Sequence, residues 1–239
     1  MIPLNSNYQL STAVLILTLN EIDGIKEILP QIDKSWAEEI VVIDGGSTDG
    51  TVEEAKKMGF SVIIQKNPGH GDAIVTGVNA TKSTNILIFG PDGNHEPSEI
   101  PRLIEKIKEG YDQVLISRFG KGSKNYDAVG IKGKLIDYFG NKMFAFLVNV
   151  FFGGHWTDSL NESRIITRKA FDELNFNSLQ MGSTQLMSIR GLKRKQKICE
   201  LVGNEGVRIG GKRKMRPLNV GADLSQQILS EFFSWCKKK

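Results

Sequence analysis

The chain has 239 residues, of which 40% are hydrophobic and 24% are charged, and its formal net charge is +4. This composition is that of an ordinary folded protein, and it excludes collagen-like, low-complexity and disulfide-framework chains, since the only cysteines are Cys199 and Cys236. We expect a cytoplasmic, reducing environment, because the N-terminus lacks the pattern of a signal peptide and no apolar run reaches the roughly 18 residues of a spanning helix.

Apolar runs alternate with helical patterns over the first half of the chain. The runs predict strands at 12–19, 40–43, 61–64, 86–89 and 113–117. Apolar residues at helical spacing predict helices at 22–32, 73–80 and 100–108, with a shorter one that a capping box of Thr51 and Glu54 would start and Gly59 would end. This alternation predicts an α/β fold with a mostly parallel sheet covered by helices on both faces.

Three loops that follow predicted strands carry Asp together with Gly or Asn, at 44–50, 68–72 and 92–94. Small residues let the backbone approach a ligand and offer its N–H groups to phosphate. None of these loops matches a P-loop or a GxGxxG dinucleotide fingerprint. Each loop alone indicates a turn, but three loops at one edge of a parallel sheet indicate a nucleotide site.

The stretch from Ile86 to Asn94 predicts a metal site. Its strand stops at Gly90-Pro91, which cannot continue a ladder, so the chain turns at Asp92. Asp92 and Asn94 both offer oxygen ligands, which suit Mg²⁺ or Mn²⁺ completed by a substrate diphosphate. A plain turn is the alternative reading of these residues.

Basic residues gather between 190 and 216, where only Glu200 and Glu205 oppose them. They are Arg190, Lys193, Arg194, Lys195, Lys197, Arg208, Lys212, Arg213, Lys214 and Arg216. Such a segment favours a phosphorylated partner, such as a phosphate substrate, an acidic membrane surface or nucleic acid, and a solvated face is the competing interpretation.

Two further segments are strongly apolar. Residues 141–152 predict a helix that is apolar almost all round, either a core helix or an interfacial one. Residues 223–239 predict an amphipathic helix that places Leu224, Ile228, Phe232 and Trp235 on one face and ends in three lysines. That pattern favours a surface-seeking helix at an anionic membrane, with packing against the parent domain as the alternative.

The motifs Thr18–Glu21, Val42–Thr51, Asn67–Gly77 and Pro91–Asn94 together resemble family 2 glycosyltransferases of the GT-A fold. The resemblance implies a nucleotide-sugar donor, GDP- or UDP-linked, with Asp44 at the base or ribose, Glu21 beside the nucleotide, and Asp92 and Asn94 at the metal–diphosphate. The wider set of nucleotide-sugar contacts that it implies is Leu19, Asn20, Glu21, Asp44, Gly46, Ser47, Gly71, Asp72, Asp92 and Gly93.

The second half is similar to the polyprenyl-phosphate mannose and glucose synthases within that family, through Ile116–Phe119, Thr157-Asp158, Ile198–Leu201 and Arg208–Met215. This similarity implies catalytic roles for Asp92, Arg118 and Arg164. It also implies that the acceptor phosphate is bound by Arg118, Lys134, Arg208 and Lys214. Three positions depart from the pattern: Asn94 replaces an acidic residue, Arg213 replaces a serine, and no acidic residue lies near Gln185.

The resemblance implies one GT-A domain over 1–220, with a nucleotide-sugar half at 12–118 and an acceptor half at 119–220, followed by the basic amphipathic helix at 221–239. A hydroxyl acceptor needs a general base, whereas a phosphate acceptor is already an anion. Because Ser183–Leu186 offers no base, we expect transfer to a polyprenyl phosphate by an enzyme that is peripheral on the cytoplasmic membrane face.

Three other functions remain open at this stage. The first is transfer of the sugar to a hydroxyl of a polysaccharide or glycolipid by the same fold. A nucleotidyltransferase is disfavoured because its glycine- and arginine-rich loop is absent after Leu19. A non-enzymatic nucleotide-binding or nucleic-acid-binding protein is disfavoured by the lack of a recognition motif, and we expect no nucleic-acid partner.

Overall fold

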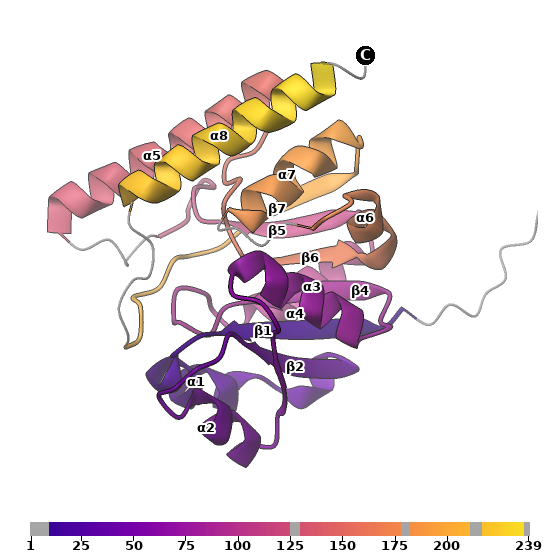
Figure 1. Ribbon diagram of the computed structural model, residues 1–239, viewed down its shortest axis with the longest axis vertical. Helices are drawn as coiled ribbons and strands as arrows, with labels where there is room; N and C mark the ends of the chain where they lie inside the picture. The colour runs from indigo at the N-terminus through magenta and orange to yellow at the C-terminus, as the bar shows by residue number, and fades with distance from the viewer. Residues whose placement is uncertain (1–9, 125–129, 178–181, 211–216, 237–239) are drawn as a thin grey trace, which may run out of the picture.

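One mixed sheet of seven strands runs through the protein (Figure 1). The computed structural model describes residues 10–124, 130–177, 182–210 and 217–236, with the backbone alone described for 130–137 and 217–219. The strands are β1 (Thr12–Thr18), β2 (Glu39–Asp44), β3 (Ser61–Ile64), β4 (Asn85–Phe89), β5 (Gln113–Ser117), β6 (Arg164–Thr167) and β7 (Ile198–Val202). Their order in the sheet is β3-β2-β1-β4-β6-β5-β7.

The strand pairing confirms the predicted α/β fold with a mostly parallel sheet. β1 pairs in parallel with β2 and β4, β2 with β3, and β5 with β7. β6, which the sequence did not reveal, is antiparallel to both β4 and β5. The loops after β1, β2, β3 and β4 therefore leave the sheet at the same edge, as predicted.

Helices cover both faces of the sheet. Their bounds are α1 (Ile22–Ile28), α2 (Thr51–Lys57), α3 (His70–Ala80), α4 (Glu99–Ile107), α5 (Gly130–Phe152), α6 (Arg168–Glu173), α7 (Ser183–Lys193) and α8 (Pro217–Cys236), with short 3₁₀ helices at Leu29–Gln31 and Lys34–Trp36. The capping box predicted for α2 is wrong, because Gly50 is the N-cap residue and the Thr51 hydroxyl donates instead to Asp49.

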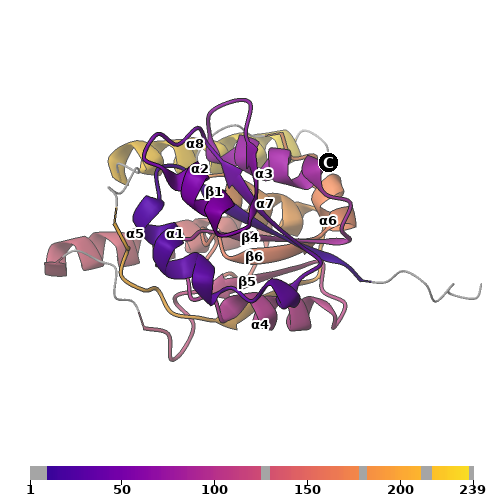
Figure 2. The same cartoon turned by 90° about the horizontal axis from the view of Figure 1, so that it is seen from below.

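Alternate residues of β1 enter two separate cores. Val14 and Ile16 pack with α1, α2 and α4, whereas Leu15 and Leu17 pack with α3, α6 and α7. Figure 2 shows α4 and α3 on opposite sides of the sheet. Because the central strands are buried on both faces, they appear in the sequence as continuous apolar runs.

A further layer consists of α5 and α8, which lie side by side above α7 (Figure 1). Leu224 and Ile228 of α8 are only 4% and 2% exposed, and Phe232 and Trp235 pack against α5 in the same cluster. The predicted surface-seeking role of this α8 face is therefore wrong, since α5 and α7 cover it. No helix in the described ranges is both long and apolar enough to cross a membrane.

Candidate active site

A cleft of about 590 Å³ lies at the sheet edge where β1, β2 and β4 end. Its walls come from the loops after these strands, from the start of α3, from the segment before β6 and from the first turns of α8. A volume of this size falls in the range of small-ligand sites. The cleft therefore joins both halves of the chain around the edge at which the sequence predicts a nucleotide.

Asp44, the last residue of β2, organises the first loop of the cleft. It is fully buried, and its Oδ1 accepts the N–H groups of Gly46 (2.9 Å) and Ser47 (2.7 Å). Its Oδ2 accepts the hydroxyls of Thr18 (2.8 Å) and Ser47 (2.6 Å). Gly45, next to Asp44, lines the cleft. The contact between Asp44 and a base or ribose stays a prediction, and it requires the loop to exchange one of these bonds.

The other residues predicted to bind the nucleotide sugar fall into two groups, those that line the cleft and those that do not. Leu19, Glu21 and Asp92 line the cleft. Asn20, between Leu19 and Glu21 in the chain, is exposed, and its N–H donates to Ser47 Oγ at 2.7 Å. The described residues that line the cleft do not include Asn20, Gly46, Ser47, Gly71, Asp72 or Gly93.

Asp72 is turned into its own loop. Its carboxylate accepts the side-chain and backbone N–H groups of Asn67 at 3.1 and 3.0 Å, and these bonds hold the pKa of Asp72 below its usual range. The cleft is lined beside it by Pro68, Gly69 and His70. Asp72 therefore fixes the shape of the loop from which these three residues reach the cleft.

The turn at Asp92 is covered by a strap, which we define as residues 205–210. The strap donates two backbone hydrogen bonds to the turn, from Gly206 to the Asn94 carbonyl (3.0 Å) and from Ile209 to the Asp92 carbonyl (2.8 Å). Both the strap and the turn require a glycine where they meet. A Cβ on Gly206 would lie 2.3 Å from the Gly93 carbonyl oxygen, and Gly93 has a φ of +85° and would place a Cβ 2.6 Å from Ile209.

Arg208 of the strap joins two carboxylates from distant parts of the chain. Its guanidinium donates to Glu21, which follows β1, and to Asp92, which follows β4. The Arg208 side chain is 18% exposed, and all three residues line the cleft. The structure thus brings together the residues predicted for the nucleotide, the metal and the acceptor phosphate.

Arg118, which follows β5, lines the same cleft and is held by two acidic groups. Its guanidinium donates to Asp158 at 2.7 and 3.1 Å and to Glu205 at 2.9 Å. Burial acts to raise the pKa of Asp158, but the Arg118 charge, the hydrogen bonds from Arg118 and the backbone N–H of Leu160 together outweigh it and lower that pKa. Glu200 of β7 fixes this corner by accepting the N–H groups of Thr157 and Asp158. Arg118 is therefore rigidly placed.

Arg164, at the start of β6, is fully buried. Its guanidinium donates to the Asn161 carbonyl at 2.6 and 3.1 Å and to Ser188 at 3.3 Å, and burial lowers its pKa to about 10. Arg164 thus lies behind the cleft wall formed by Leu160, Asn161 and Glu162 rather than in it. We expect it to support that wall instead of contacting a substrate, which corrects the predicted catalytic contact.

The remaining predicted cations are spread over the molecule. The Lys134 side chain and Lys214 lie outside the described residues. Arg190 and Lys193 of α7 bind Glu231 of α8 at 2.8 and 2.6 Å, and so hold these two helices together. The basic segment is therefore not one surface, and of its described members Arg208 reaches the cleft.

Sequence reasoning missed a pair of titratable groups in the cleft, His70 and Glu162. His70 Nε2 lies 3.4 Å from Glu162 Oε2, and the Glu162 side chain is 28% exposed. Burial acts to raise the pKa of Glu162, but the nearby His70, together with His95 and Arg164, outweighs it and lowers that pKa. Glu162 is thus an anion at neutral pH. No sequence pattern marks Glu162, because it lies in an irregular segment just before β6.

The residues of the Asp92 turn fit a divalent cation that a substrate completes. The N–H of Asn94 donates to Asp92 Oδ1 at 3.1 Å, so one tight turn carries both side chains to the cleft wall. One carboxylate and one amide oxygen are hard ligands, and Mg²⁺ is commonly held by one or two carboxylates together with substrate phosphates. Within the described part of the chain, no cluster of three His, Cys, Asp or Glu side chains is arranged to hold a metal alone.

The sequence matches the family model of glycosyl transferase family 2 over residues 13–174. Among characterised sequences, it is 28% identical to the dolichyl-phosphate hexose transferase of Haloferax volcanii, over 91% of this chain and 92% of that protein. It is also 28% identical to the glycosyltransferase AglJ of the same organism, over 77% of this chain and 59% of AglJ. Dolichol-phosphate mannosyltransferase of Pyrococcus furiosus shares 32% identity over 48% of this chain and 35% of its own length.

Among solved structures, the chain resembles glucosyl-3-phosphoglycerate synthase from Mycobacterium tuberculosis in complex with Mn²⁺, UDP and phosphoglyceric acid. The two align with a TM-score of 0.70 and 22% identity, over 94% of this chain and 79% of that one. The complex of the same enzyme with UDP aligns with a TM-score of 0.69. These likenesses concern the fold, and they confirm the predicted GT-A architecture.

Proposed function

The chain belongs to glycosyl transferase family 2, and from that premise we propose that it moves a sugar from a GDP- or UDP-linked donor to the phosphate of a polyprenyl phosphate. The donor diphosphate would lie at Asp92, where a Mg²⁺ or Mn²⁺ ion held with Asn94 would neutralise charge on the leaving group. The names of two similar proteins, a dolichyl-phosphate hexose transferase and a dolichol-phosphate mannosyltransferase, support this acceptor class.

The observation that carries the proposal is the placement of two arginines and one polar turn in a single cleft. Arg118 and Arg208 both line the cleft that contains Asp92 and Asn94. Arginine suits phosphate because its guanidinium donates in a planar, bidentate fashion. Both arginines carry carboxylate partners here, so a bound phosphate would compete with Glu205, Glu21 or Asp92 for them.

Ser183–Leu186 offers no general base. This is the segment in which we expected hydroxyl-transferring relatives to carry one. Ser183 and Gln185 of α7 are fully buried, and the Gln185 amide donates to the Leu224 carbonyl of α8 at 3.1 Å. These residues therefore lie beneath α8. A phosphate acceptor needs no proton acceptor at this place, because its oxygen is already ionised.

The experiment offers radiolabelled UDP- and GDP-sugars with a polyprenyl phosphate or with the matching unphosphorylated polyprenol. The expected result is label in a mild-acid-labile lipid with the phosphate only, and its loss in Asp92→Ala. Label entering the polyprenol or a glycan hydroxyl, with none entering the phosphate, would overturn the proposed acceptor. No transfer from any donor would overturn the donor assignment as well.

One observation favours a second candidate, transfer to a hydroxyl of a glycan or glycolipid. Glu162 is an ionised carboxylate in the cleft, and its neighbour His70 is itself titratable. A carboxylate in such a position can accept the proton of an attacking hydroxyl. The two candidates therefore differ in whether catalysis requires Glu162.

A further inference from the structure

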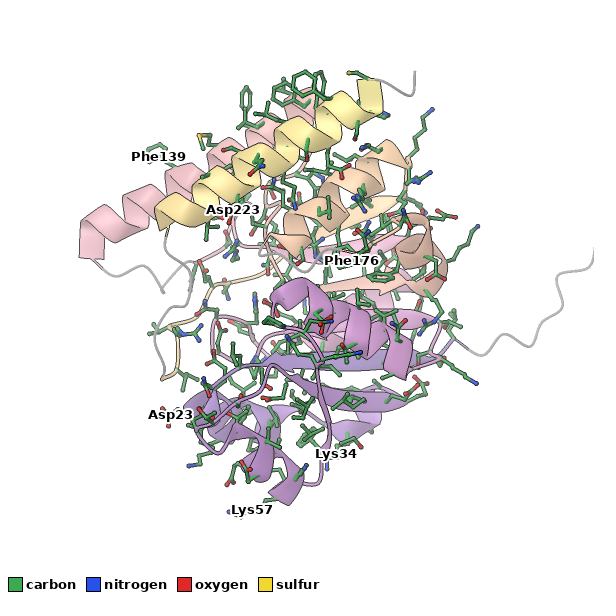
Figure 3. All side chains as sticks on the ribbon, viewed as in Figure 1. Asp23, Lys34, Lys57, Phe139, Phe176 and Asp223 are labelled. Carbon is green, nitrogen blue, oxygen red and sulfur yellow. The ribbon has the colours of Figure 1, made fainter. Side chains whose placement is uncertain are left out.

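The outer face of α5 exposes a continuous stripe of large apolar side chains. Phe139, Met143, Phe146 and Val150 are 63%, 49%, 63% and 60% exposed. Their spacing of four, three and four residues places them on one face of the helix. The opposite face, which includes Val148, is buried against the body of the protein. Figure 3 shows Phe139 projecting from α5 away from the sheet.

α8 extends this apolar surface. Leu229 and Phe233 are 49% and 60% exposed, and the ring of Phe233 lies 5.8 Å from the ring of Phe232. The rings of Phe151 and Phe232 lie 5.0 Å apart at the seam between the two helices. Of the twelve exposed large hydrophobic side chains in the described residues, seven belong to α5 and α8, and the other five are scattered over separate segments.

The stripe begins at the rim of the cleft. The ring of Tyr138, in α5, lies 5.6 Å from the ring of Phe119, which directly follows the cleft residue Arg118. In α8, Val220 and Asp223 line the cleft, and Figure 3 shows Asp223 near the start of that helix. Both helices therefore run from the cleft mouth to the far end of the apolar surface.

Apart from Asp223 at the cleft end, the charges of the described α5 and α8 side chains are positive or neutralised. No acidic residue occurs between Tyr138 and Phe152, whereas Lys142 does, and three lysines follow α8 in the sequence. Glu231, the acidic group in the second half of α8, is neutralised by Arg190 and Lys193. An apolar face with a cationic flank is complementary to the interface of an anionic lipid bilayer.

We propose that the outer faces of α5 and α8 form the docking surface for an anionic lipid bilayer, with Phe139, Met143, Phe146, Val150, Leu229 and Phe233 inserted at the headgroup level. The role of this surface rests on the proposed function. A polyprenyl phosphate held in the bilayer would then have its phosphate at the height of the cleft mouth. It differs from the sequence prediction, which assigned membrane contact to the face of α8 that is buried.

The test measures sedimentation of the full chain with vesicles of phosphatidylcholine and phosphatidylglycerol that contain no polyprenyl phosphate. The double variant Phe139→Ser/Phe146→Ser is expected to bind about tenfold more weakly for each phenylalanine lost. The matched control is Ile64→Ser, which changes a side chain that is 52% exposed on β3, at the far edge of the sheet, and it should bind like the parent. Binding should also weaken with salt.

Parallel assays separate this inference from the proposed function. Transfer to a short-chain polyprenyl phosphate dissolved in detergent should survive in the double variant, because the cleft is unchanged. Parent protein that stays in the supernatant, or a double variant that binds as tightly as the parent, overturns the docking surface while leaving the proposed function intact. A parent dimer that the double variant dissociates also overturns it, in favour of a second copy of the chain. Vesicle binding without transfer to any lipid overturns the proposed function alone.

Discussion

Replacing Arg208 by alanine should change the affinities for metal and for nucleotide in opposite directions. In the structure its guanidinium donates to both Glu21 and Asp92. Removing it leaves two carboxylates in the cleft without their shared cation and frees the Asp92 oxygen for a divalent ion. At the same time, the cleft loses a cation that could contact a diphosphate.

The size of the effect follows from the lost bonds. A hydrogen bond to a charged group contributes about 1.5–3 kcal/mol, and each 1.4 kcal/mol corresponds to about a tenfold change in affinity. Freeing one bond to Asp92 should therefore tighten Mn²⁺ binding in the absence of nucleotide by about 10- to 100-fold. The affinity for a nucleoside diphosphate at saturating Mn²⁺ should fall by a similar factor.

Paramagnetic resonance of free Mn²⁺ measures the first affinity, and calorimetry measures the second. Arg208→Lys keeps a positive charge but loses the fork geometry, so its effects should be intermediate. Arg190→Ala is the matched control, because Arg190 also binds a glutamate, Glu231, but lies outside the cleft. Weaker or unchanged Mn²⁺ binding in Arg208→Ala would refute the idea that the guanidinium and the ion compete for Asp92.

Three further predictions concern the loops around the cleft. Asp44→Ala should weaken nucleoside diphosphate binding by about 1–3 kcal/mol, and unaltered affinity in calorimetry would contradict this. Gly206→Ala should reduce transfer, because its Cβ would meet the Gly93 carbonyl at 2.3 Å, whereas Gly221→Ala, with nothing within 4 Å, should not. The pKa of Asp158 is lower in the folded protein, so its pairing with Arg118 stabilises the fold above about pH 4 and is lost as the pH falls through the folded pKa. The urea midpoint of Asp158→Asn should be lower than that of the parent at neutral pH, and the two midpoints should converge as the pH is lowered into the acid range.

The strands and the cleft edge were predictable from the sequence for a simple physical reason. A strand covered by helices on both faces must be apolar throughout, as β1 and β4 are. Asp44 ends the apolar run of β2 and Asp92 follows that of β4, so the pattern alone was enough to place them at the sheet edge. β6 escaped detection because it is four residues long and begins with the buried Arg164, which no hydrophobic pattern can mark.

Contacts between distant segments were not predictable from the sequence. Arg208 and Glu21 are 187 residues apart in the chain, and nothing in either motif indicates that they form a bridge. The direction in which α8 faces was ambiguous for a related reason. Its amphipathic pattern fits burial against a neighbouring helix as well as against lipid, and the choice depends on α5, whose apolar residues occur on both its faces.

Glu162→Gln provides the sharpest separation between the two acceptor classes. Glutamine keeps the size of the side chain but cannot accept a proton. If Glu162 were the general base for a hydroxyl acceptor, kcat should fall by about 10²- to 10⁴-fold while donor affinity stays unchanged. The proposed phosphate acceptor requires no base, so we expect kcat for a polyprenyl phosphate to change by less than about tenfold, which a larger loss would contradict.

The pH dependence offers a second readout of the same prediction. Because the pKa of Glu162 lies below the usual glutamate range, a mechanism that needs its anion would lose activity only as the pH falls below about 4.5. Glu162→Gln would remove that acid limb along with the activity. With a phosphate acceptor, the limb should instead follow ionisation of the acceptor phosphate and persist in Glu162→Gln. An acid limb that disappears in the variant would therefore identify Glu162 as the base and the acceptor as a hydroxyl.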